Sequence, residues 1–141
     1  MLTVRRARTD ELHTCFAVRY EVFVLGQGVP PELEVDGHDP SCFHFIAHWR
    51  DELAGTTRLR ITKEGTAKIE RVAVRPPWQG RGVGTELVHA AENFAREQGY
   101  AEVMLSAQEK VVPFYARLGY EPVGERFMEA CIPHRKMKRT L

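Results

Sequence analysis

Residues 75 to 84 read RPPWQGRGVG and place three glycines within five positions, directly after the strand-like segment 67 to 74. Glycine loses more conformational freedom on folding than other residues, so such a cluster needs a reason. Pro76 and Pro77 stop the preceding strand, because proline cannot donate to a sheet ladder. From Gly84 onward the apolar residues recur at helical spacing. The stretch is therefore a strand-to-helix junction, and its glycines form either an ordinary turn or a cradle for a ligand.

A helix that starts at this junction offers a natural seat for an anion. Its first turn leaves about four backbone N–H groups unpaired beside the positive end of the helix dipole. Glycines let phosphate oxygens approach these groups, since no Cβ is in the way. Two common phosphate loops do not match. No Lys-Ser/Thr pair follows Gly82 or Gly84 as in nucleoside triphosphatases, and the hairpin-like strands before the loop do not suit a dinucleotide fingerprint. A packing turn and a phosphate cradle both stay open at this point.

The composition predicts a single domain over residues 1 to 141, with 43% apolar and 28% charged residues as in ordinary globular proteins. A formal net charge of +1 gives no field to attract nucleic acid or a membrane surface, so we expect neither as a partner. The three cysteines form no CxxC pair and the histidines show no metal spacing, so no metal site is expected. Without a secretory or membrane-spanning segment, a cytoplasmic location is expected.

The pattern along the chain predicts hairpin strands first and then strands alternating with helices, which indicates a mixed sheet with helices on its faces. A long loop, from 25 to 41, interrupts the first half. Expected strands are 2–6, 43–49, 53–62, 67–74, 101–105, 121–124 and 132–139, and expected helices begin near residues 12, 84 and 111. In the strand 67–74, alternation places Ile69, Arg71 and Ala73 on one face and Glu70, Val72 and Val74 on the other.

Two motifs resemble the GNAT superfamily of N-acetyltransferases. Residues 74 to 84 resemble its signature V-x-P followed by [Q/R]-x-x-G-x-[G/A], and residues 114 to 120, FYARLGY, resemble its F-Y-x-x-x-G-[F/Y] block. Two spaced motifs in this order are more specific than either alone. Residues 19 to 30, Ala107-Gln108 and Ile132-Pro133-His134 are similar to the ElaA-like branch of small bacterial proteins. That branch often has glycine before the last triplet, where this chain has Cys131.

The resemblance implies an α/β (α+β) fold with a mixed, mostly antiparallel central sheet of six to seven strands and helices on both faces. It implies an acetyl-CoA-dependent N-acetyltransferase that acts on a primary amine by direct attack in a ternary complex, with no metal. The pyrophosphate of coenzyme A would lie on the loop residues Gln79, Gly80, Arg81, Gly82, Val83, Gly84 and Thr85. Pantetheine would lie along the strand end formed by Val72, Ala73 and Val74.

The resemblance also suggests catalytic roles. Tyr115 matches the tyrosine that protonates the departing thiolate in many family members, although its helical spacing with Phe114 and Leu118 also suits a core tyrosine. Glu70 is the leading candidate for the base that takes the amine proton. An ion pair between Glu70 and Arg58 or Arg71 is the alternative. Arg19, Gln108 and His134 are expected to contact the acceptor, and His134 is the second candidate base.

A second function remains open from the sequence, namely a non-catalytic module on the same fold that binds or senses acyl-CoA. Tyr115 and Glu70 favour the enzyme. The loop 25–41 contains the acids Glu32, Glu34, Asp36 and Asp39. These acids would suit a cationic amine, but an acidic loop also serves solubility alone. The sequence identifies no acceptor, small molecule or peptide, and leaves a homodimer open.

Overall fold

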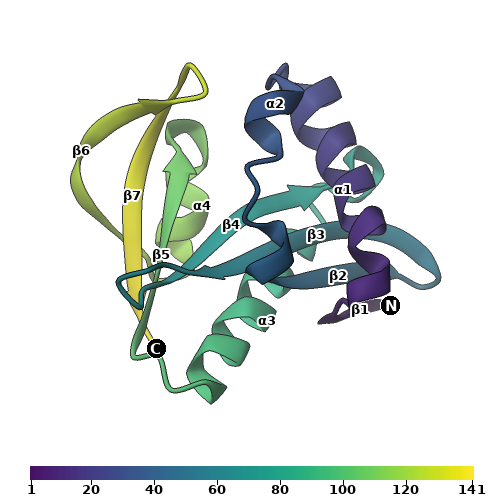
Figure 1. The fold of residues 1–141 in the computed structure, drawn as a ribbon, viewed down its shortest axis with the longest axis horizontal. Helices are drawn as coiled ribbons and strands as arrows, with labels where there is room; N and C mark the ends of the chain where they lie inside the picture. The colour runs from purple at the N-terminus through teal and green to yellow at the C-terminus, as the bar shows by residue number, and fades with distance from the viewer.

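The computed structural model describes residues 1 to 141 and contains one seven-stranded sheet in the order β1-β2-β3-β4-β5-β7-β6 (Figure 1). The strands are β1 (Leu2–Arg6), β2 (Phe43–Trp49), β3 (Glu52–Ile61), β4 (Ala67–Val74), β5 (Glu102–Gln108), β6 (Glu121–Glu129) and β7 (Ile132–Thr140). All neighbours are antiparallel except β4 and β5, which are parallel. The expected mixed, mostly antiparallel sheet is confirmed.

Helices cover both faces of this sheet (Figure 1). On one face lie α1 (Leu12–Arg19), which continues into a π-helical segment over Tyr20–Leu25, and the short α2 (Pro31–Glu34). On the other face lie α3 (Val83–Glu97) and α4 (Val112–Arg117). The helical turn α2 and a 3-10 turn over Asp39–Ser41 are the only regular structure between residues 28 and 42. No helix combines the length and the apolar character that a membrane crossing requires.

The main core lies between α3 and the sheet. The helix buries one apolar stripe, as its 3.6-residue periodicity predicts, consisting of Val83, Leu87, Val88, Ala91 and Ala95. The ring of Phe94 extends this contact to Phe43 and Phe45 on β2, with centroid distances of 4.6 and 6.0 Å. Gly99, with a φ of +92°, follows the C-cap residue of the helix in the left-handed conformation that glycine favours. Both ends of α3 lie within two residues of their predicted positions.

The two halves of the sheet separate at the junction of β4 and β5. These strands pair only over Ala67–Ile69 and Val103–Leu105, and beyond that point they diverge. A β-bulge lies at the same place: Arg58 pairs with Glu70 and Thr56 with Ala73, so one residue of β3 faces two residues of β4. The extra residue, Arg71, has a φ of +56°. The bulge and the divergence leave the later part of β4 without a partner on its β5 side.

This bulge corrects the predicted facing of the β4 side chains. Thr56 and Arg58 lie two residues apart and share a face of the sheet, so their partners Ala73 and Glu70 share that face as well. Val72 and Val74 lie on the opposite face and pack against the α3 core. Strict alternation put Glu70 with Val72 and Val74, which is wrong because the inserted residue reverses the alternation. Glu70 therefore faces the α1 and α2 side.

Candidate active site

The divergence of β4 and β5 opens a cavity of about 790 Å³, which we call the central cavity. This volume lies within the range of pockets that bind small molecules and cofactors. Its walls come from the π-helical segment, the loop 27–38, the bulged part of β4, the glycine loop, the end of β5, α4 and the β6–β7 turn. Both sequence motifs therefore border one space, because Gly80 and Gly84 line it from one side and Phe114 and Tyr115 from another.

The glycine loop presents a row of free backbone donors. Gly80 and Gly82 have φ values of +76° and +82°, conformations that other residues adopt only with strain. The N–H groups of residues 80 to 85 donate to no backbone carbonyl, and the first bond of the helix runs from the Glu86 N–H to the Gly82 carbonyl at 3.1 Å. Successive N–H groups at the start of a fifteen-residue helix form the kind of concave donor site that binds phosphate.

The residues expected to hold coenzyme A divide into two groups. Those that line the central cavity are Val72, Val74, Gln79, Gly80 and Gly84. Those that do not are Ala73, Arg81, Gly82, Val83 and Thr85. Ala73 and Val83 are buried, and the Arg81 guanidinium lies 5.6 Å from the centroid of the Trp49 ring. In this second group only the backbone of the loop residues can contact a ligand, because the side chains of Ala73 and Val83 lie in the core.

Substitution of Gly82 by alanine is expected to lower the free energy of unfolding by about 1 kcal/mol, because the new Cβ is strained at positive φ. The matched control is Gly84→Ala. Gly84 lies inside the first turn of α3 without a positive φ, and a Cβ there would meet the Phe114 ring at an ordinary 3.5 Å. Urea unfolding should therefore show a loss for Gly82→Ala and none for Gly84→Ala. Equal losses would mean that the positive φ of Gly82 does not require glycine.

Tyr115 lies on α4 at the wall of the central cavity, with 8% of its surface exposed. Its ring packs edge-on against Phe114 and Tyr120, at centroid distances of 4.9 and 5.8 Å. Its hydroxyl makes no hydrogen bond with the protein, although the neighbouring Tyr120 hydroxyl donates to Glu92 at 2.6 Å. Burial raises the pKa of Tyr115 well above its ordinary value of 10.0. The phenol therefore stays protonated at neutral pH, and its hydroxyl has no partner inside the protein.

His134 and Gln108 are cross-strand neighbours on β7 and β5 and both line the central cavity. The Nδ1 of His134 lies 2.7 Å from the Ile132 carbonyl oxygen. Because a carbonyl oxygen only accepts, Nδ1 carries the proton and Nε2 presents a lone pair. Nε2 lies 3.6 Å from the Glu129 carboxylate. The Gln108 amide donates to the Gln27 side chain at 2.7 Å, which ties the end of β5 to the loop after α1.

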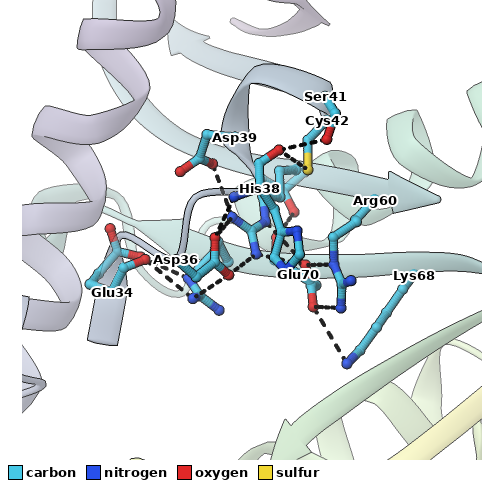
Figure 2. Close-up of polar contacts among 12 residues, drawn as sticks. Glu34, Asp36, His38, Asp39, Ser41, Cys42, Arg60, Lys68 and Glu70 are labelled. Carbon is cyan, nitrogen blue, oxygen red and sulfur yellow. Dashed lines mark hydrogen bonds and ion pairs between the residues drawn. The ribbon is translucent and has the colours of Figure 1, made fainter. Parts of the chain in front are cut away.

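Arginines and carboxylates form a buried ion-pair network beside the cavity (Figure 2). It contains Arg19, Glu34, Asp36, Asp39, Arg58, Arg60, Lys68, Glu70 and Arg71. Arg58, with no exposed surface, bonds to Asp36, Asp39 and Glu70 at 2.6 to 3.1 Å. The network joins the loop between α2 and β2 to β3 and β4. The loop thereby becomes a fixed wall of the cavity.

The network determines the surroundings of two predicted site residues. Glu70 bonds to Arg58 and Arg60 and lies 3.4 Å from the Lys68 ammonium, so the ion-pair interpretation describes its contacts. Burial would raise the pKa of Glu70, but the Arg60 hydrogen bonds and the Arg58 charge outweigh it and lower the pKa to about 2. Arg19 bonds to Glu34 and Asp39, is 1% exposed and does not line the cavity. Its expected contact with the acceptor is not supported by this position.

Stability should depend on pH through these carboxyls. The pKa values of Glu70, Asp36 and Asp39 are lower in the folded protein than their ordinary values, because arginines pair with the ionised forms. Their contribution is therefore complete above the ordinary value of about 4.5 and is lost as the pH falls toward 2. For Glu70 alone the shift corresponds to roughly 3 kcal/mol. Urea unfolding should give a steep fall in stability below about pH 4.5; greater stability at pH 3 than at pH 5 would contradict the network's role.

The chain matches the family described as an acetyltransferase (GNAT) domain over residues 11–141. It is 35% identical over 140 residues to an uncharacterised N-acetyltransferase of Bacillus subtilis (strain 168), YjcF, with 99% of both chains covered. An acyl-CoA N-acyltransferase from Pseudomonas aeruginosa has a TM-score of 0.84 and 32% identity, covering 99% of this chain and 98% of that one. Escherichia coli ElaA has a TM-score of 0.83 and 26% identity, with 99% of each chain covered. The chain therefore belongs to the GNAT acetyltransferase family.

Proposed function

We propose that the protein is an acetyl-CoA-dependent N-acetyltransferase that acetylates a primary amine by direct attack within a ternary complex. One observation carries the proposal: Gly80 and Gly84, whose N–H groups are free, and Tyr115, whose hydroxyl is free, come from separate motifs and line the same cavity. Membership of the GNAT family supports acyl transfer in general. A module that only binds acyl-CoA would need the donor row but would not need an unbonded, protonated phenol.

The chain offers a continuous seat for acetyl-CoA, which would supply the activated acetyl thioester. The N–H groups of residues 80 to 85 would hold the pyrophosphate. Beyond Ile69, the β4 backbone has no partner on its β5 side and can pair with the amide groups of an extended pantetheine chain. Val72 and Val74 line that slot. From its end the thioester would lie near Tyr115.

Two proton transfers complete the reaction. As the amine nitrogen bonds to the acetyl carbon and the carbon–sulfur bond breaks, the nitrogen must lose a proton and the sulfur must gain one. From its position in the cavity wall, Tyr115 would give its phenolic proton to the departing sulfur. His134 Nε2, with its lone pair available, is the better placed base. Glu70 is a weak base, because three cations hold its pKa near 2.

Steady-state kinetics tests the proposal. Free thiol release from acetyl-CoA is followed at several fixed concentrations of an amine, and double-reciprocal plots should intersect, as a ternary complex requires. Parallel lines would indicate an acyl-enzyme and contradict direct transfer. An acyl-enzyme would need a nucleophile in the cavity. The exposed Cys131 lies between the lining residues Ala130 and Ile132 but does not itself line the cavity. Binding of acetyl-CoA without turnover on any amine would favour the non-catalytic module instead.

Substitution of His134 by glutamine is expected to lower kcat/KM about 100-fold, because the amine then loses its proton acceptor. Thiol release at several amine concentrations measures this loss. His13→Gln, at an exposed position on α1, is the control and should keep the wild-type kcat/KM. An unchanged kcat/KM in His134→Gln would remove His134 from the mechanism.

A further inference from the structure

We propose that the acceptor amine carries an anionic group, a carboxylate or a phosphate, which binds against Arg60 and Lys68 at one end of the central cavity. The inference rests on the proposed function, because it describes the second substrate of the same site. It begins from the hydrogen-bond donors of Arg60 and Lys68 that their ion pairs with Glu70 leave free. Both residues line the cavity, with side chains 21% and 24% exposed.

The carboxylates of this wall are already paired with cations of the protein. Each oxygen of Glu34, Asp36 and Asp39 accepts at least one hydrogen bond from inside the protein. Both Glu70 oxygens are likewise bonded. The donors to these four acids are the side chains of Arg19, Arg58, Arg60 and Arg71 and the His38 N–H. The acidic loop thus stabilises the fold and leaves no acid on this wall free to bind a cationic acceptor.

The cations of the same wall keep free donors. Arg60 bonds to Glu70 through Nε and Nη2, at 2.9 and 3.1 Å, and its Nη1 makes no hydrogen bond. The Lys68 ammonium makes a single ion pair, 3.4 Å from a Glu70 oxygen. Arg58 also bonds to Glu70, but Asp36 and Asp39 share its charge, so Arg60 and Lys68 are the two cations that have Glu70 as their one acidic partner. Figure 2 shows Arg60 and Lys68 on the same side of Glu70. This corner therefore has excess positive charge, and an anionic group would neutralise it.

The position of this corner sets where the anionic group lies relative to the reacting amine. Arg60 and Lys68 are directly opposite each other on β3 and β4. Lys68 lies four residues before Val72, and Val72 marks the end of the slot proposed for pantetheine. At about 3.3 Å per strand residue the two Cα atoms are roughly 10 to 13 Å apart. The Lys68 ammonium lies beside Glu70, on the Val72 side of its own Cα. An acceptor with several bonds between its amine and its anionic group would therefore span the distance from the thioester to Lys68.

The remaining charged residues of the cavity lining are placed elsewhere. Lys110 lies in the turn before α4, and Glu129 lies beside His134 at the β6–β7 turn. Arg71, the third cation of the wall, bonds to Glu34 and Asp36. None of these contacts places an acid that would cancel the free donors of Arg60 and Lys68. An arginine fork beside an ammonium is a donor set that binds carboxylate and phosphate groups strongly.

The test compares amines of matched length. The wild-type enzyme is assayed by thiol release with ε-aminocaproate, aminohexyl phosphate, hexylamine and hexamethylenediamine. We expect kcat/KM for at least one of the two anionic amines to exceed that for hexylamine about tenfold or more, through charge-assisted hydrogen bonds. The better of the two identifies the anionic group. Equal or greater activity with hexylamine or the diamine would overturn the inference while leaving the N-acetyltransferase proposal intact.

Variants locate the effect. Lys68→Gln should lower kcat/KM for the anionic amine about tenfold more than kcat/KM for hexylamine, and Lys68→Arg should restore part of this difference. The control is Lys63→Gln, a lysine in the turn of the same hairpin that does not line the cavity. It should behave as the wild type. A preference for the anionic amine that survives Lys68→Gln in full would contradict the assigned position.

A binding measurement separates this inference from the proposed function. Calorimetry with caproate and with inorganic phosphate, which carry the anion without the amine, needs no turnover. Binding to the wild type and its loss in Lys68→Gln would support the anion site even if acetyl-CoA were not a substrate. If neither caproate nor inorganic phosphate binds, the result counts against the site. Failure of acetyl-CoA itself to bind would instead overturn the proposed function.

Discussion

Replacement of Tyr115 by phenylalanine is expected to lower kcat about 100- to 10,000-fold while leaving the affinity for acetyl-CoA unchanged. The variant keeps the ring that packs against Phe114 and Tyr120 and removes only the hydroxyl, which makes no bond inside the protein. The departing thiolate then loses the hydroxyl that is proposed to protonate it. The measurement is kcat from thiol release at saturating amine, together with the Kd of acetyl-CoA from calorimetry.

The control for this prediction is Tyr100→Phe. Tyr100 is partly buried against the core after α3 and does not line the central cavity, so its loss of a hydroxyl tests the cost of such a change away from the chemistry. We expect its kcat to stay within about twofold of the wild type. Unchanged kcat in Tyr115→Phe with a saturating, verified acceptor would show that the tyrosine is only a core residue.

Replacement of Arg58 by glutamine is expected to lower the free energy of unfolding by about 3 to 5 kcal/mol. The variant would leave Asp36, Asp39 and Glu70 without the guanidinium that bonds to all three of them. Each acid would keep one other arginine partner but would lose its charge-assisted hydrogen bonds to the fully buried guanidinium. Urea unfolding at pH 7 measures the loss, and Arg58→Gln should also reduce the steep acid dependence of stability.

Arg5→Gln provides the comparison, because Arg5 also makes an ion pair, with Glu11 at 2.6 Å, but its side chain is 45% exposed. Exposed pairs contribute little, so this variant should change the free energy of unfolding by less than about 1 kcal/mol. Similar losses for Arg58→Gln and Arg5→Gln would mean that burial of the network does not determine its contribution to stability.

The sequence was sufficient to predict the elements that carry strong local patterns. The fifteen-residue α3 has a continuous apolar stripe and glycines at both ends, and its bounds follow from them. The hairpin of β2 and β3 likewise follows from aromatic and β-branched residues around a polar turn. The motif at residues 74 to 84 located the junction and the free N–H groups. These features depend on residues close together in the chain, which one sequence shows directly.

The bulge in β4 could not be predicted, since no local residue signals it. Arginine is an unusual residue at positive φ, and neither glycine nor asparagine stands at position 71 to suggest a left-handed conformation. The bulge is visible only in the pairing with β3, where one residue of β3 faces two residues of β4. Gly124 had the opposite effect. It suggested the end of a strand, but the structure uses it, with a φ of +76°, inside the longer strand β6.

The ion-pair network also exceeded what one sequence can show. Arg19 stood out as a cation on the apolar side of a helix, and acids were evident in the following loop. Their pairing depends on contacts between residues 15 to 37 positions apart, such as Arg19 with Glu34 and Arg71 with Glu34. Only the fold brings these groups together. For the same reason the sequence suggested an acidic, cation-binding loop, whereas the structure shows acids that are already paired.

Amine-dependent release of free thiol from acetyl-CoA by the wild-type protein tests the central claim most directly. We predict thiol release that saturates in both acetyl-CoA and the amine, with one acetylated amine formed for each thiol released. Thiol release that does not depend on the amine, or an absence of release with every amine while acetyl-CoA binds, would contradict the claim that this cavity transfers an acetyl group.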